Sequence, residues 1–247
     1  MTTDWLDGAL AHTFGGLDGL TERTVGYPAL FRELGLGGPG VSTLLDYGCG
    51  PGWIALEIAE RYDVEITAVD IAPEMLRLAR ARPHPRVRHR LLDASGLDFL
   101  APSSIDAAMC CFVFSNVAEL TELRRITDAV GRVLRPGGRY VLMDANPDAT
   151  GTAFASFRTG EPGRTYEAGE PRRVELYGPG DRPLELVDYH WPEETYRQLL
   201  ADAGFRGVRA LRPRATLAQA ERIRAVTRAA TVAESTLAPL LLIVAER

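Results

Sequence analysis

A short stretch of the chain places alternate glycines beside a carboxylate. It runs from Asp46 to Gly52 with the sequence D-Y-G-C-G-P-G, between an apolar segment, residues 43–46, and a helical pattern, residues 54–59. Because glycine has no β-carbon, a ligand can contact the main chain there, and the following helix offers free N–H groups. The stretch therefore predicts a loop that binds a small ligand through its backbone, with a carboxylate close enough to hold a cationic group.

The spacing of the glycines argues against a dinucleotide. A loop of the form Gly-x-Gly-x-x-Gly would need its third glycine at position 53, which is Trp53. Two more carboxylates, Asp70 and Asp93, each close a predicted strand, and the carboxyl ends of parallel strands meet at one edge of a sheet. Either carboxylate alone is more typical of a helix cap or a solvated turn, but their joint spacing favours a ligand site.

Taken together, these segments resemble the motifs of the class I S-adenosylmethionine (SAM)-dependent methyltransferases. The match runs in order from residue 43 to residue 144 and includes the segments 111–117 and 134–138. The resemblance implies that SAM is the cofactor, that S-adenosylhomocysteine is the product left from it, and that the chain is an enzyme methylating a small molecule. In that family the glycine loop cradles the methionine part of SAM, and its acidic residue contacts the ammonium group.

The resemblance also implies a role for the other residues on the cofactor side. Asp70 would accept hydrogen bonds from the ribose hydroxyls, while Asp93 and the Ala94 amide would contact the adenine. Ile71 and Met75 would pack against that ring. Cys111 in the fourth strand would offer its backbone carbonyl, and Tyr27 would line a lid over SAM. The predicted cofactor-binding residues are Asp46, Gly48, Cys49, Gly50, Gly52, Asp70, Ile71, Met75, Asp93, Ala94, Cys111 and Tyr27.

Two residues are candidates for work on the acceptor. His190 follows a predicted hairpin and has a side chain suited to act as a general base; the alternative is that it only packs beside Trp191. Asn116 follows the fourth strand, where it could contact the acceptor or simply pack the loop. Asp144 alone is thin support for a metal site, so no metal is predicted.

Hydrophobic periodicity places these residues on an α/β fold. Strands are expected at residues 43–46, 64–69, 87–92, 105–111, 140–143, 207–211 and 240–245, with helices between them. The resemblance implies a Rossmann-like, doubly wound, mostly parallel sheet of order 3-2-1-4-5-7-6, with strand 7 antiparallel. One domain, 1–247, is expected, with a helical lid at 1–40 and an insertion at 145–189 that forms the acceptor side. A hairpin of 174–177 and 184–189 is predicted in the insertion, and a helix at 217–234.

Composition excludes several functions. The chain has no lysine, which rules out Schiff-base enzymes and Walker-type NTPases, and its net charge of −5 makes a nucleic-acid partner unfavourable. An arginine-rich segment, residues 77–90, is the local exception; exposed charge on an edge strand is the alternative. Without a signal sequence or an apolar run long enough to span a bilayer, the expectation is a cytoplasmic protein with no membrane partner and free cysteines.

The sequence leaves the acceptor open. We expect methyl transfer to an oxygen, nitrogen or carbon atom of a small molecule, within specialised (natural product) metabolism. One alternative is a SAM-binding protein that catalyses a rearrangement or cyclisation without methylation; another is an RNA methyltransferase that uses the arginine-rich segment. The oligomeric state also stays open, a homodimer being one alternative.

Overall fold

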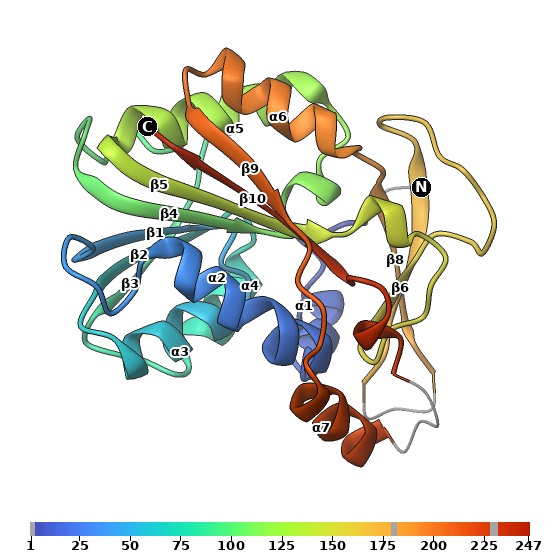
Figure 1. Ribbon diagram of the computed structural model, residues 1–247. Helices are drawn as coiled ribbons and strands as arrows, with labels where there is room; N and C mark the ends of the chain where they lie inside the picture. Colours follow the sequence, from blue (N-terminus) through green and yellow to red (C-terminus); the bar gives the residue numbers. More distant parts are fainter. Residues whose placement is uncertain (1–2, 179–181, 228–231) are drawn as a thin grey trace.

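The computed structural model of the protein describes residues 3–178, 182–227 and 232–247. Its main sheet is built from β1 (Thr43–Tyr47), β2 (Glu65–Asp70), β3 (Val87–Leu91), β4 (Ile105–Cys111), β5 (Leu134–Ala145), β9 (Arg206–Leu211) and β10 (Leu240–Glu246). The strands lie in the order β3-β2-β1-β4-β5-β10-β9, and β10 runs antiparallel to both of its neighbours (Figure 1). This confirms the predicted fold, because β9 and β10 are the sixth and seventh strands of the expected order.

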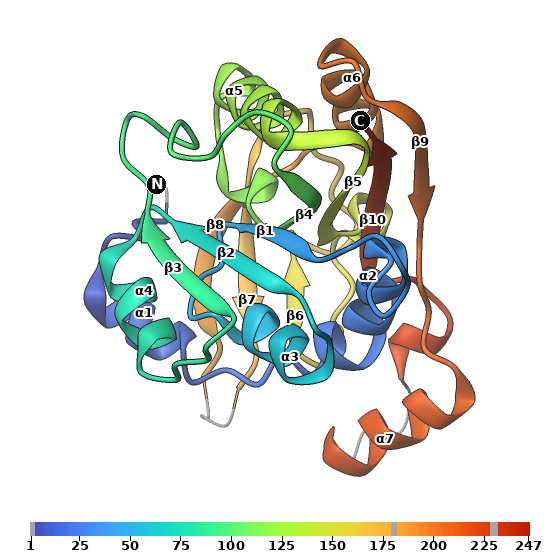
Figure 2. The same cartoon turned by 90° about the vertical axis from the view of Figure 1, so that its left-hand side faces the viewer.

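Helices cover both faces of the main sheet (Figure 2). The α-helices are α1 (Gly8–Phe14), α2 (Tyr27–Leu34), α3 (Trp53–Arg61), α4 (Pro73–Arg80), α5 (Leu120–Val133), α6 (Glu193–Asp202) and α7 (Leu217–Thr227). The short turns are a π-helix, η1 (Glu22–Gly26), and the 3₁₀ turns η2 (Phe114–Asn116), η3 (Pro147–Ala149) and η4 (Ala233–Ser235). One face of the sheet carries α2, α3 and α4, and the other carries α5 and α6, so two buried apolar clusters form on opposite faces of one sheet.

The insertion forms a second sheet at the carboxyl ends of the parallel strands, to the right in Figure 1. It consists of β6 (Phe157–Thr159), β7 (Pro171–Leu176) and β8 (Leu184–Tyr189), all antiparallel. The predicted hairpin corresponds to β7 and β8, but the sheet has a third strand, β6, that the sequence analysis missed. A strand of three residues gives too short an alternation to be recognised, and its partners are supplied by tertiary structure.

Other differences concern the ends of elements. The strand expected at 140–143 extends from Leu134, where α5 has just ended, and its pairing with β4 is irregular between Ile105 and Ala107. The helix expected at 217–234 ends at Thr227 among the described residues, and a 3₁₀ turn follows at Ala233–Ser235. Residues 179–181 of the expected hairpin turn lie outside the described residues. No helix in the described part of the chain is long and apolar enough to cross a membrane.

Candidate active site

A cavity of about 300 Å³ lies at the carboxyl ends of β1, β2 and β4, between the main sheet and the second sheet. Its walls come from the N-terminal helical segment, the strand ends with their loops, and β6 to β8. It brings together these predicted site residues: Tyr27, Asp46, Gly48, Cys49, Gly50, Asp70, Ile71, Met75, Cys111 and Asn116. Four others, Gly52, Asp93, Ala94 and His190, are not among the residues that line it.

The glycine loop has left-handed backbone at each of its glycines. Gly48 has φ of 75°, and a β-carbon there would lie 2.2 Å from Val113 Cγ2. Gly50 has φ of 53°, and a β-carbon there would meet nothing within 4 Å, because that side of the loop is open. At Gly52 a β-carbon would lie 2.9 Å from Ala79 Cβ, so this glycine serves the packing of the loop on α4. The sequence therefore bends the main chain back and leaves it accessible at the cavity.

Asp70 ties this loop to the next one. Its Oδ2 accepts a hydrogen bond of 2.8 Å from the Gly50 N–H, and its Oδ1 accepts one of 2.8 Å from the Ala72 N–H. Burial raises the pKa of Asp70, while these backbone hydrogen bonds act in the opposite direction. The carboxylate thus closes the turn before α4, as the structural interpretation of an isolated aspartate anticipates, and at the same time lines the cavity.

Asp46 has the most unusual environment in the site. Its side chain is 1% exposed, and its Oδ2 has no hydrogen-bond partner among the described residues. Burial and, to a smaller extent, the nearby charge of Asp70 raise the pKa of Asp46 to about 8. An unpartnered buried carboxylate oxygen is costly. An ammonium group in the cavity would supply both the missing hydrogen bond and the counter-charge, so Asp46 fits the methionine end of SAM.

Two apolar and two thiol residues belong to the part of the cavity where the cofactor is predicted to bind. Met75 is buried with Ala72 beneath α1, whereas Ile71 is 59% exposed and offers an apolar surface beside Asp70. Cys49 and Cys111 are buried, and burial raises the pKa of both thiols well above the usual value. Both therefore stay protonated and act as packing residues, not as nucleophiles.

Asp93 lies apart from this group. It is exposed, and its Oδ1 accepts hydrogen bonds from the Ser95 N–H at 2.8 Å and from Ser95 Oγ at 2.5 Å. These hydrogen bonds lower the pKa of Asp93. The structure thus gives Asp93 the geometry of a turn-forming aspartate, and the predicted contacts of Asp93 and Ala94 with adenine stay predictions.

The two candidate acceptor residues have different surroundings. The Asn116 amide is engaged on both sides: its Nδ2 donates to the Phe112 carbonyl at 2.5 Å, and its Oδ1 accepts from Trp5 Nε1 at 3.0 Å. His190 is half-buried outside the cavity, with its Nδ1 3.4 Å from an Arg172 nitrogen. Burial and then the Arg172 charge lower the pKa of His190. These contacts agree with packing roles, and the predicted contacts of both residues with the acceptor stay predictions.

The acceptor half includes residues that the sequence analysis did not single out. Asp188 lines the cavity from β8 and forms a buried, two-pronged ion pair with Arg172 at 2.7 and 2.9 Å. Burial raises the pKa of Asp188 to about 6 in spite of this partner. Glu22 lines the same cavity from η1. The alternation of β7 and β8 could have indicated Asp188, since it shares a face with buried apolar residues; no local pattern marks Glu22.

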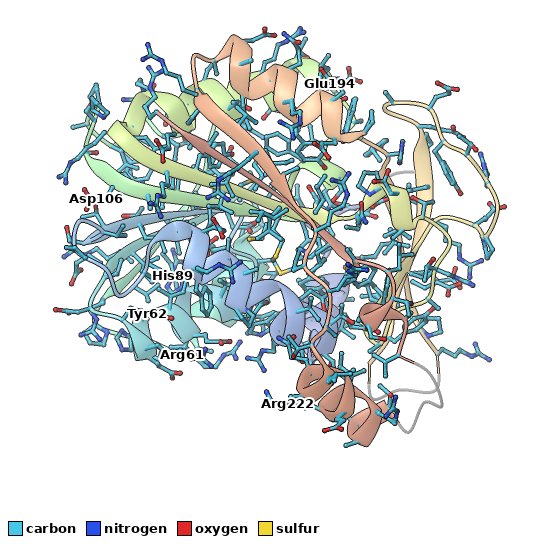
Figure 3. The ribbon with its side chains drawn as sticks, viewed as in Figure 1. Arg61, Tyr62, His89, Asp106, Glu194 and Arg222 are labelled. Carbon is cyan, nitrogen blue, oxygen red and sulfur yellow. The ribbon has the colours of Figure 1, made fainter. Side chains whose placement is uncertain are left out.

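Several arginines of the arginine-rich segment contact other parts of the protein. Arg86 donates to the Ala59 carbonyl at 2.8 Å, Arg80 donates to the His89 carbonyl at 3.2 Å, and the Arg90 guanidinium lies 3.9 Å above the Phe99 ring. β3 is an edge strand of the main sheet. His89, labelled in Figure 3, lies far from the second sheet, as does Asp106 at the amino end of β4. This geometry agrees with the edge-strand interpretation.

Comparisons with known proteins agree with one another. Residues 44–138 match the family described as "Methyltransferase domain". N-demethylindolmycin N-methyltransferase of Streptomyces griseus is 36% identical over 213 residues, which cover 84% of this chain and 90% of that protein. Demethylmenaquinone methyltransferase of Deinococcus radiodurans is 39% identical over 119 residues, 48% of its length. The crystal structure of a SAM-dependent methyltransferase from Mesorhizobium loti superposes with a TM-score of 0.62 at 26% identity, covering 94% of this chain and 100% of that one.

Proposed function

The chain belongs to the class I SAM-dependent methyltransferases, and from this premise we propose that it methylates a nitrogen atom of a small, mostly apolar molecule. The cofactor is SAM, which supplies a methyl group carried on a positively charged sulfur. The N-demethylindolmycin N-methyltransferase, similar over most of the chain, supports nitrogen as the acceptor atom and natural product metabolism as the setting.

The charge of the cavity is the observation that carries this proposal. Among the described residues that line it, every charged side chain is acidic: Glu22, Asp46, Asp70, Glu122 and Asp188. The chain has many arginines, yet none of the described ones lines the cavity. Such a cavity repels carboxylate and phosphate groups and accepts cationic or neutral ones. An amine fits it better than an acidic acceptor does.

We further propose that the chain forms a single domain in which different segments have different roles. Residues 1–40 act as a helical lid, and residues 145–189 form the acceptor side, where Phe157, Val174 and Leu186 contribute apolar surface to the cavity. The glycine loop, Asp46 and Asp70 hold the cofactor. Because the protein needs only to align two reactants, most of its contribution is positional, on the order of 7 kcal/mol or more in favourable cases.

The experiment is an acceptor screen with the purified protein and SAM. N-demethylindolmycin and a set of indole-bearing amines are incubated beside matched alcohols and carboxylic acids, and the products are analysed by mass spectrometry for a methyl group and for S-adenosylhomocysteine. We expect methylation at nitrogen for the amines and none for the acids. Methylation restricted to oxygen or carbon, or activity on the acids, would contradict the proposal.

The same screen separates the alternatives. A catalyst of rearrangement or cyclisation would convert an acceptor without forming S-adenosylhomocysteine. An RNA methyltransferase would label RNA and lose binding in proportion to salt concentration. RNA is not the expected substrate, because Arg80, Arg86 and Arg90 contact other parts of the protein and the cavity is acidic.

A further inference from the structure

Glu22 is a carboxylate of the cavity wall without a cationic partner. Among the described residues no arginine forms an ion pair with it, whereas Glu122 pairs with Arg125 at 2.6 Å and Asp188 pairs with Arg172 at 2.7 Å. The remaining two carboxylates of the cavity, Asp46 and Asp70, belong to the cofactor half. Glu22 is therefore the uncompensated negative charge on the acceptor side.

The Glu22 carboxylate is fixed by a buried network that joins distant parts of the chain. Ser156 Oγ donates a hydrogen bond of 2.5 Å to Glu22 Oε2, and the Thr21 N–H donates to the same Ser156 oxygen at 3.2 Å. Thr21 Oγ1 in turn donates to Glu234 at 2.7 Å, and the Ala155 N–H donates to that carboxylate at 2.7 Å. Thr21 and Glu234 are almost fully buried, so the network holds Glu22 in one position.

The backbone that carries Glu22 is itself unusual. η1 is a single π-helical turn, closed by a hydrogen bond from the Tyr27 N–H to the Glu22 carbonyl. Both Glu22 and Tyr27 line the cavity. The turn can approach the main sheet because it ends at Gly26, where a β-carbon would lie 2.6 Å from Leu240 Cδ1. Single π turns occur frequently at functional sites, and this one directs two side chains toward one cavity.

The second sheet lines the acceptor half of the cavity with an apolar face that has polar groups at both ends. Phe157, Leu176 and Leu186 lie on the face that lines the cavity. At one end of this apolar face lies the Arg172–Asp188 pair; at the other lie Ser156 and Tyr177, which are joined by a backbone hydrogen bond of 2.8 Å. The distance from Arg172 to Tyr177 along an extended strand is about 16 Å. An apolar ring system thus fits along this face, between the end that holds the Arg172–Asp188 ion pair and the end where Ser156 donates its hydrogen bond to Glu22.

From this geometry we infer that Glu22 binds the amino group of the acceptor and receives the proton that the nitrogen loses on methylation. The inference rests on the proposed function, because it concerns an amine acceptor. An acceptor that binds as an ammonium ion first gives one proton to the Glu22 carboxylate, which frees the nitrogen lone pair. The lone pair then forms the new N–C bond as the C–S bond breaks and its electrons return to sulfur. The methylated amine leaves as a cation, and Glu22 releases its proton to solvent.

The electrostatics of Glu22 suit this role. Burial raises the pKa of Glu22, and the nearby charges of Asp18 and Glu234 act in the same direction, while the hydrogen bond from Ser156 lowers it. A carboxylate with a raised pKa is a better proton acceptor than an ordinary surface glutamate. An ammonium or N–H group beside it would gain a charge-assisted hydrogen bond in a partly buried setting.

The test measures binding to the complex with S-adenosylhomocysteine by calorimetry, with two probes that differ in one group: tryptamine, which carries an ammonium group, and uncharged 3-ethylindole. We expect the native protein to bind tryptamine about tenfold or more tightly than 3-ethylindole, as a charge-assisted hydrogen bond would give. Glu22→Gln should abolish this preference, leaving 3-ethylindole and SAM affinities within about twofold of native. Equal binding of the two probes by the native protein, binding of neither, or a preference retained in Glu22→Gln would overturn the inference.

Asp18→Asn is the matched control. Asp18 is exposed, lies four residues before Glu22, and accepts a hydrogen bond from the Leu20 N–H that asparagine can also accept. The variant removes one negative charge from the same segment, so the preference for tryptamine should persist in it; its loss would show a general charge effect and overturn the role of Glu22. Failure of the proposed function is distinguishable, because it would show as no nitrogen methylation in the acceptor screen while the binding preference and its dependence on Glu22 remain.

Discussion

The two halves of the cavity are built in opposite ways. The cofactor half uses consecutive strand ends and loops of the main sheet, with Asp46, Gly50 and Asp70 following one another along the chain. The proposed acceptor half combines parts of residues 5–22 with the second sheet, and Ser156 reaches Glu22 across a separation of 134 residues. The cofactor half can therefore be specified locally, while the acceptor half exists only when distant segments pack together.

The largest effect on stability should come from removing the buried ion pair of the acceptor half. The Arg172 and Asp188 side chains are 2% and 8% exposed, so Arg172→Met leaves a buried carboxylate without a partner. We expect the free energy of unfolding to fall by about 3–5 kcal/mol at pH 7.5, measured by urea denaturation. The loss should shrink as pH decreases from 7.5 toward about 6, because Arg172 lowers the pKa of Asp188 in the native protein, and without it the carboxyl takes up a proton in the folded state at a higher pH.

Arg173→Met provides the comparison for this variant. Arg173 is the next residue on β7, its side chain is 54% exposed, and it pairs with Glu185 at the surface. Its replacement should cost less than about 1 kcal/mol. Equal losses in the two variants would mean that the buried pair has no special role in the acceptor half.

The cofactor half should respond to Asp70→Ala with a loss of ligand affinity. Asp70 receives two backbone hydrogen bonds and lines the cavity, so we expect SAM affinity to fall more than about tenfold in calorimetric titration, with the circular dichroism spectrum unchanged. Asp63→Ala, at a carboxylate whose side chain is 99% exposed, is the control and should bind SAM normally. Native SAM affinity in the Asp70→Ala variant would show that Asp70 does not contribute to cofactor binding.

Asp46 should make SAM binding depend on pH. In the free protein its pKa is about 8, and a protonated carboxyl cannot pair with the ammonium group of SAM. Affinity should therefore rise as pH increases from 6 to 8, by about tenfold or more, and decline above pH 8 as the amino group of the ligand loses its proton. Asp46→Asn should remove the rise on the acid side; if the rise persists, another group controls it.

The smallest effect is expected at His190. This residue is not among those that line the cavity, and its ring faces Arg172, so His190→Phe should change kcat/KM for the acceptor by less than about threefold. Glu22→Gln, assayed alongside it, should lower the same parameter by about tenfold or more. A large loss in His190→Phe with native activity in Glu22→Gln would return the role of base to His190.

The comparison of the halves also explains which sequence predictions were correct. The bounds of β4, Ile105–Cys111, agree with the expected strand because a fully buried parallel strand is apolar throughout. β6 was missed because it is short and paired only through tertiary contacts. His190 was predicted from its chemistry and its position after a hairpin; its ring lies 3.4 Å from an Arg172 nitrogen, and its role in the reaction stays a prediction.

The sequence by itself determined most of the strand positions and the glycine loop, because hydrophobic periodicity and glycine backbone preferences act over a few neighbouring residues. The order of the strands in the sheet followed from the family resemblance. The sequence also determined the family, through motifs that follow one another in order between residues 43 and 144. Only the tertiary structure decided which carboxylates face the cavity and which of them have an arginine partner. Burial and ion pairing depend on residues far apart in the chain, as with Glu22 and Ser156 or Asp188 and Arg172, and no local pattern records those distances.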